Sequence, residues 1–158
     1  MKLETLGLEL VRDSKGKSEA FYIKGKNTKI GPELVAALKE RLAETGAGAV
    51  RVCLHPGPEA PVHDMIIVHK AGGDNRPHKH LAKEETYHMI EGRMRLEFYG
   101  ESGALESSLV LGAPGSGLPF AFRVRPNTWH ATIPETEHAV FHESRPGPFE
   151  GGDSVSRT

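Results

Sequence analysis

Residues 72–92 read GGDNRPHKHLAKEETYHMIEG and bring two histidines and a glutamate together at short spacing. In an extended strand alternate side chains point to the same face, so His78 and His80 can both contact one ion. Glu85 opens the next hydrophobic run, and a short turn between the two strands brings its carboxylate beside the imidazoles. The stretch therefore predicts a metal site.

A fourth candidate ligand, His130, follows downstream in the segment Pro126-Asn127-Thr128-Trp129-His130. Three imidazoles and one carboxylate suit one divalent transition metal, with Fe, Mn, Ni and Zn all compatible. The ligand list does not decide between them. Such a site leaves one or two coordination positions for water or substrate, which permits Lewis-acid or redox chemistry.

These residues resemble the two sequence motifs of the cupin superfamily. The first motif matches fully, as Gly72, five residues, His78-x-His80, four residues, Glu85, six residues and Gly92. In the second motif Arg125 stands at the usual proline, Asn127 at the usual glycine and His130 at the last ligand. Asn tolerates a left-handed turn better than other non-glycine residues, so the loop geometry is retained. The resemblance implies an all-β fold, a cupin jelly roll or double-stranded β-barrel.

Residues 50 to 150 also look like the WbuC-type cupin fold metalloproteins, a narrower family. The similar segments include Arg51–His55, Val62–Val68, Arg76–His80 and Phe141–Glu143. That family is associated with bacterial surface-polysaccharide gene clusters. The resemblance implies one metal-binding barrel in a polysaccharide-related setting, and it implies no particular reaction.

Three parts are expected along the chain. Residues 1–48 form an N-terminal extension that packs on the barrel, with a hairpin around the polar turn Asp13–Lys17 and one helix from Gly31 and Pro32 to Gly46. Residues 49–150 form the barrel, and residues 151–158 a disordered tail. Short runs rich in Val, Ile, Phe and Tyr predict strands near 49–54, 64–69, 75–80, 85–91, 93–99, 105–111, 119–125, 128–133 and 137–143.

Composition excludes several classes of protein. The formal net charge of the 158 residues is -1, which selects neither nucleic acid nor membrane as a partner. A single cysteine excludes an internal disulfide framework and fits a reducing compartment. The sequence has no apolar run of membrane-spanning length and no signal-peptide core, so we expect a cytoplasmic protein.

Further residues are predicted to line the site. Tyr87 and Met89 share the parity of Glu85 and should point into the barrel, whereas His88 and Trp129 have the opposite parity and are expected to pack. His55, His63 and His142 are expected at the barrel mouth with two arginines, where they would bind a carboxylate or phosphate. The catalytic candidates are Tyr87, His63 and His55, and the substrate-binding candidates are Arg51, Arg76, Met65, Met89 and His142.

Three functions compete at this point. The first is a metal-dependent enzyme acting on a small polar or anionic metabolite, such as a sugar or sugar nucleotide. The same ligands permit an Fe(II)-dependent dioxygenase, and a non-catalytic module or sensor that holds a metal and a small acid is also compatible. Cupin barrels commonly pair through their edges, so a homodimer is expected.

Overall fold

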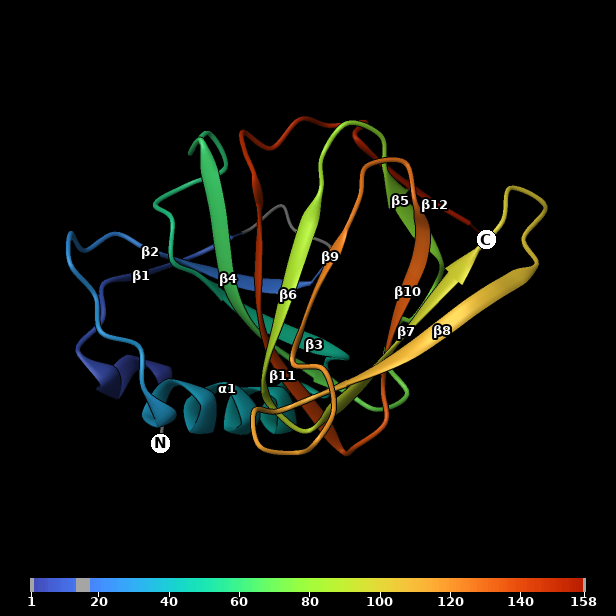
Figure 1. Cartoon of the computed structure of the whole chain (residues 1–158). Coiled ribbons are helices and arrows are strands. Elements are labelled where there is room, and N and C mark those ends of the chain that lie inside the picture. Colours follow the sequence, from blue (N-terminus) through green and yellow to red (C-terminus); the bar gives the residue numbers. More distant parts are fainter. Residues whose placement is uncertain (1, 14–17, 158) are drawn as a thin grey trace.

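The structure is a computed structural model that describes residues 2–13 and 18–157. Within these ranges two sheets face each other and one α-helix lies outside them (Figure 1). The elements are η1 (Leu3–Leu6), β1 (Leu10–Arg12), β2 (Glu19–Ile23), α1 (Pro32–Thr45), β3 (Ala49–Cys53), β4 (Val62–Lys70), β5 (His78–His80), β6 (Glu85–Glu91), β7 (Arg93–Tyr99), β8 (Leu105–Gly112), β9 (Ala121–Val124), β10 (Trp129–Pro134), β11 (His138–Pro146) and β12 (Ser154–Ser156). The strands predicted between residues 49 and 143 are confirmed, with bounds that agree to within a few residues.

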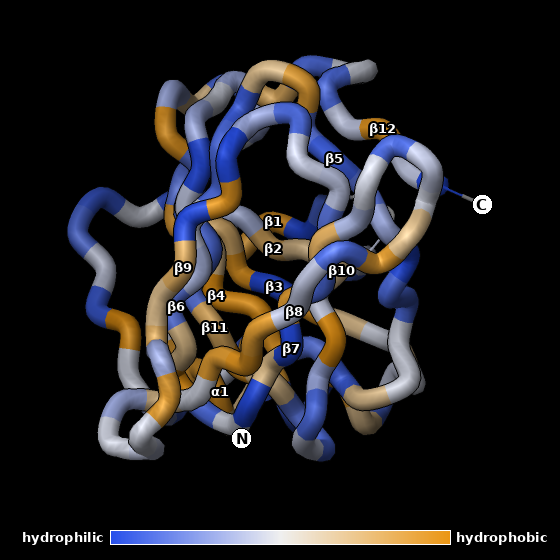
Figure 2. Tube along the Cα trace, turned by 45° about the vertical axis from the view of Figure 1, so that its right-hand side comes forward, coloured by the Kyte–Doolittle hydropathy of each residue, from blue (hydrophilic) through white to orange (hydrophobic). Residues whose placement is uncertain are grey.

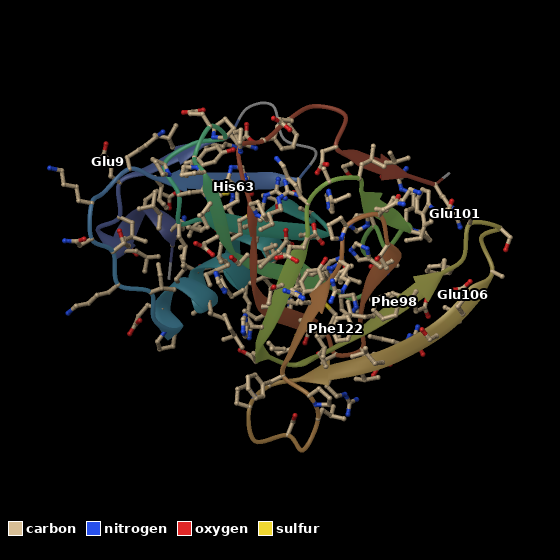
Figure 3. The ribbon with its side chains drawn as sticks, turned by 45° about the horizontal axis from the view of Figure 1, so that its top comes forward. Glu9, His63, Phe98, Glu101, Glu106 and Phe122 are labelled. Atoms are coloured by element: carbon tan, nitrogen blue, oxygen red, sulfur yellow. The ribbon has the colours of Figure 1, made fainter. Side chains whose placement is uncertain are left out.

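One described sheet has the order β1-β2-β3-β4-β11-β6-β9 and the other the order β12-β5-β10-β7-β8. The core between them takes Met65, Ile67 and Phe141 from the first sheet and Met94 and Leu96 from the second. Near the far edges the rings of Phe98 on β7 and Phe122 on β9 approach to 5.5 Å between centroids (Figure 3). The fold class predicted from the sequence, an all-β barrel with one helix, is confirmed.

Helix α1 covers the outer face of the first sheet. Its apolar residues recur every four positions at Leu34, Leu38 and Leu42, so they form one stripe along the helix. This stripe packs against outward-facing residues of β3, β4 and β11 in a second core cluster. Figure 2 shows the hydrophobic stretches gathered along these elements, with hydrophilic residues in many of the loops. The predicted start at Gly31 and end at Gly46 are confirmed.

The N-terminal strands extend the first sheet. β1 and β2 pair antiparallel, as the hairpin prediction requires, although residues 14–17 of the predicted turn lie outside the described residues. β2 then pairs parallel with β3, and α1 makes the connection between them. A parallel pair needs such a crossover, since a tight turn can only join antiparallel strands.

The prediction of a disordered tail is wrong for the described residues of that segment. Ser154–Ser156 form strand β12, which pairs antiparallel with β5 at the edge of the second sheet (Figure 1). The short polar segment carries no hydrophobic alternation, because it is held by backbone hydrogen bonds to β5 and not by burial of apolar side chains. This is why its sequence gave no strand signal.

Two turns that border the ligand-bearing strands β6 and β10 need unusual backbone angles. Gly92, between β6 and β7, has φ of 76°, and a Cβ atom there would collide with the carbonyl oxygen of His138. Asn127, before β10, has φ of 59°, so the predicted left-handed turn at this position is confirmed. The Asn127 backbone N–H donates to the carbonyl oxygen of His80 at 2.6 Å, which ties this turn to β5.

Candidate metal centre

Three strands bring the four predicted ligands together inside the barrel. His78 on β5 is the direct register partner of His130 on β10, and His80 lies two residues further along β5 on the same face. Glu85 begins β6 on the opposite sheet. His80, Glu85 and His130 are buried, with exposed fractions of 7%, 2% and 1%.

The ligand atoms converge on a small volume. Those of His78, His80 and Glu85 all lie within 4.8 Å of one another. Glu85 Oε1 lies 2.5 Å from His80 Nε2, and Glu85 Oε2 lies 3.2 Å from His130 Nε2. The ring centroids of His78 and His130 are 4.4 Å apart. One carboxylate thus faces the imidazole nitrogens of both strands.

Backbone carbonyls fix the orientation of two of the imidazoles. His130 Nδ1 lies 2.9 Å from the carbonyl oxygen of Thr128, and His78 Nδ1 lies 3.4 Å from that of Arg76. A carbonyl only accepts, so Nδ1 carries a proton and Nε2 is left as the nitrogen that a metal would bind. Metal-bound histidines in proteins show this arrangement, with the second nitrogen held by an acceptor.

The charge states also fit a metal. Burial, with His130 adding to it, lowers the pKa of His78 to about 4, which keeps this imidazole neutral. Burial raises the pKa of Glu85, but hydrogen bonds from His130 and His80 outweigh it and hold that pKa well below its ordinary value. Burial lowers the pKa of His130, but the hydrogen bond to Glu85 and the charge of that carboxylate outweigh it and raise this pKa. Neutral imidazole and ionised carboxylate are the forms that bind metal, so His78 and Glu85 are already in the required states and a metal would displace a proton from His130.

Tyr87 lies directly beside the ligands. Its hydroxyl donates to Glu85 Oε2 at 2.5 Å and lies 3.2 Å from His130 Nε2. Glu85, Tyr87 and Met89 are all buried, whereas His88 between them is exposed. The predicted inward parity of Tyr87 and Met89 is confirmed, and the expected packing position of His88 is wrong. Trp129 is largely buried, with its indole N–H donating to Glu101.

β11 contributes two charged residues that sequence reasoning missed. Arg145 Nη1 lies 3.6 Å from Glu85 Oε1, and Glu143 is the register partner of Tyr87. Burial, reinforced by the charge of Glu85, raises the pKa of Glu143 to about 7. Both residues share the inward parity of Phe141. The available signal was this alternation, which continues past the predicted end of the strand at residue 143.

Histidines form a pair at one end of β4. The rings of His55 and His63 stack with centroids 4.1 Å apart, and Figure 3 shows His63 at that end of the strand. His63 Nε2 lies 3.0 Å from the carbonyl oxygen of Pro58, and His63 is the register partner of Arg145. Burial, with His63 adding to it, lowers the pKa of His55 to about 4. The pair thus neighbours the metal centre through β11.

Arg51 and Met65 lie on the inward face of the first sheet. Met65 is buried between the two sheets with Met89, and it pairs with Glu143. Arg51 pairs with Ile67, another residue of that inner core. Its Nε atom is buried and makes no hydrogen bond with the described residues. A guanidinium is therefore held inside the barrel without a partner for this atom.

Two substrate-binding candidates are not brought to this interior. The guanidinium of Arg76 is exposed and makes paired hydrogen bonds to Asp74, with 2.6 Å between Arg76 Nη2 and Asp74 Oδ2. His142 lies on the outer face of β11, where its Nε2 lies 3.1 Å from Asp64 Oδ1 and its ring stacks on His88. Strand alternation explains the second correction, since the inward positions of β11 are Phe141, Glu143 and Arg145.

Several solved structures are similar to this chain. Peruvianin-I, a cysteine peptidase from Thevetia peruviana latex, aligns with a TM-score of 0.53 and 18% identity over 70% of this chain and 69% of its own. Oxalate decarboxylase from Bacillus subtilis aligns with a TM-score of 0.52 and 18% identity. The alignment covers 68% of this chain and 27% of the oxalate decarboxylase chain. Protein SO0799 from Shewanella oneidensis aligns with a TM-score of 0.52 and 16% identity. The alignment covers 63% of this chain and 64% of the SO0799 chain.

The chain has the cupin fold. At these identities the likeness extends to the fold alone, and this chain spans about a quarter of the oxalate decarboxylase chain. A model for a domain of unknown function, DUF6016, matches residues 34–111 of the cupin. Its sequence matches no curated protein. Across the described residues, the cupin has no helix that is both long enough and apolar enough to cross a membrane.

Proposed function

We propose that this cupin is a metal-dependent enzyme that acts on a small anionic metabolite. The observation that carries the proposal is the group of His78, His80 and Glu85, whose candidate ligand atoms lie within 4.8 Å of one another. His130 Nε2 lies 3.2 Å from the Glu85 carboxylate, and backbone carbonyls face the Nδ1 atoms of His78 and His130. A divalent ion bound there would supply Lewis-acid or redox chemistry.

The residues around the ligands support a division of roles. Tyr87 holds a proton at its hydroxyl, 2.5 Å from Glu85 Oε2, and is the best-placed group to exchange a proton with a bound substrate. Arg51 offers a buried donor without a partner, which suits a carboxylate or phosphate. His63 and His55 stand next to Arg145 at the end of β4 and would contact the far end of the ligand.

The sole cysteine of the sequence is not part of this proposal. Cys53 is buried, and that burial raises the pKa of its thiol to about 11. A nucleophilic cysteine needs a lowered pKa, because the thiolate is the reactive form. The reacting groups are therefore assigned to the metal centre.

The resemblance to the WbuC-type cupins supports a narrower substrate class. We infer a sugar or sugar nucleotide of surface-polysaccharide metabolism, whose carboxylate or phosphate would meet Arg51. The candidate metals are Fe, Mn, Ni and Zn, since imidazole and carboxylate ligands accept all four.

Elemental analysis of protein purified without an affinity tag tests the proposal. Wild-type protein should carry close to one equivalent of a transition metal, and His78→Ala should lose it. The matched control is His88→Ala, because His88 is exposed and points away from the ligands. A wild-type protein that neither retains nor takes up any of the four metals would contradict the proposal, and so would equal metal content in both variants.

A further inference from the structure

The C-terminal strand lies directly against the ligand strand. In the antiparallel pairing of β12 with β5, Ser154 faces His80 and Ser156 faces His78. β5 also pairs with β10, so the short ligand strand has a neighbour on each side. Any displacement of β12 would therefore reach both ligands of the His-x-His pair.

Asp153, the residue before β12, faces the outer nitrogen of one ligand. Its Oδ2 lies 3.5 Å from His80 Nδ1, and its side chain is only 11% exposed. Two hydrogen bonds fix it there. Asp153 Oδ1 accepts a hydrogen bond from the backbone N–H of Ala82 at 3.0 Å, and the backbone carbonyl oxygen of Asp153 accepts one from the backbone N–H of Leu81 at 2.9 Å.

His80 needs an acceptor at this place. The outer nitrogens of His78 and His130 face backbone carbonyls, whereas His80 Nδ1 is buried and makes no hydrogen bond with the described residues. An imidazole that gives its Nε2 lone pair to a metal keeps its proton on Nδ1. A buried N–H without an acceptor is unfavourable, and the Asp153 carboxylate is the acceptor that the described part of the chain offers within ion-pair distance.

Arg157 holds the other end of β12. Its backbone N–H donates to the carbonyl oxygen of Pro77 at 2.9 Å, and its guanidinium donates to the carbonyl oxygens of Gly100 and Glu101, each at 3.0 Å. The guanidinium carbon also lies 4.0 Å from the centroid of the Trp129 ring. Figure 3 shows Glu101 at the end of β7, beside the C-terminal segment. Asp153 is thus part of a strand that is fixed at both ends.

We propose that Asp153 is a positioning residue for the metal ligand His80. Its carboxylate accepts a hydrogen bond from the Nδ1–H of His80, which keeps the Nε2 lone pair directed at the ion and strengthens the imidazole as a ligand. The inference rests on the proposed function, because it assigns a partner to one ligand of that metal centre. It gives the C-terminal segment a role in setting metal affinity.

The test compares Asp153→Asn with Glu150→Gln. Both changes remove one negative charge from the same segment, but the Glu150 carboxylate is exposed and lies 3.9 Å from Lys83, whereas the Asp153 carboxylate is largely buried and faces His80. Asparagine retains an oxygen acceptor for the Ala82 N–H and loses the carboxylate that faces His80. Each apo protein is titrated with Zn²⁺ and with Co²⁺, and the melting temperature of each apo form is measured.

We expect Asp153→Asn to weaken Zn²⁺ and Co²⁺ binding about tenfold or more and to change the visible Co²⁺ spectrum. Glu150→Gln should bind both ions like the wild type, and the apo melting temperatures should agree. Equal affinity in Asp153→Asn and the wild type would overturn the inference and leave the proposed function standing. If the wild type bound neither ion, the proposed function and this inference would both be overturned.

A third variant distinguishes the effect of the Asp153 carboxylate on metal affinity from the effect of docking strand β12. Arg157→Ala removes the clamp on β12 and leaves the Asp153 carboxylate in place, so we expect a smaller loss of affinity than in Asp153→Asn. A loss as large as that of Asp153→Asn would assign the effect to docking of the strand, and the role of the carboxylate would then be refuted.

Discussion

Arg51 places a guanidinium on the inner face of the barrel, where its Nε atom has no hydrogen bond to the described residues. This atom is buried, and the same inward face also carries Met65 and Ile67. A buried polar atom without a hydrogen bond destabilises a fold, whereas a hydrophobic residue of similar size is often neutral or stabilising there. We therefore read Arg51 as a residue retained for binding.

This reading predicts that Arg51→Met stabilises the ligand-free protein by about 1 kcal/mol or more in urea unfolding. The measurement belongs at pH 6, below the pKa of about 7 of nearby Glu143, so that this carboxyl stays protonated and needs no counter-charge. The same variant should lose the rise in melting temperature that small carboxylates or phosphate give the wild type. Arg125→Met is the control, since Arg125 is exposed. A less stable Arg51→Met protein would argue against a binding role.

Residue-level prediction from sequence worked where spacing alone determines geometry. His78 and His80 share a strand face, and Tyr87 follows Glu85 with the same parity, so both relations are fixed by the period of two. The position of Asp153 beside His80 could not be predicted from the sequence, because it depends on a strand pairing across more than seventy residues of chain. His142 was placed on the wrong face because the parity of β11 relative to the barrel axis was not determined.

Elements with clear end signals were predicted to within a residue or two. β6 and β7 have the predicted bounds, since Gly92 separates two runs of β-forming residues. Helix α1 has proline at its first position and a left-handed glycine after its last. β12 has no apolar pattern, and Gly151-Gly152 before it fits a turn as well as a disordered end; the strand forms because β5 offers it an open edge.

The helix itself yields a stability prediction. Leu38 is fully buried between α1 and the first sheet, so Leu38→Ala should lower the free energy of unfolding by about 2–5 kcal/mol in urea. Val35→Ala on the same helix is the comparison, because Val35 is only partly buried and should cost less. Similar losses for both variants would mean that α1 does not dock through the Leu34–Leu42 stripe.

At the scale of the molecule, the ligands join the two sheets. Glu85 belongs to the sheet that contains β6, whereas His78, His80 and His130 belong to the sheet that contains β5 and β10. An ion bound by all four would cross-link the barrel halves. Ion binding and folding are consequently coupled, since the site does not exist in the unfolded chain.

Metal should therefore raise the stability of the whole fold. At a free metal concentration one hundred times Kd, the expected gain is about 2.7 kcal/mol. Thermal unfolding with added Zn²⁺ should show a higher melting temperature than with EDTA, and His78→Ala should show no difference between the two conditions. An equal rise in His78→Ala would indicate that the ion binds elsewhere.

The position of β5 between β10 and β12 has a consequence for protein synthesis. Both neighbours follow β5 in the sequence, so a nascent chain emerging from the ribosome presents His78 and His80 long before residues 129–134 and 154–156 exist to pair with them. The His-x-His segment therefore precedes both of its partner strands during synthesis, and its pairing is completed only when residues 154–156 follow.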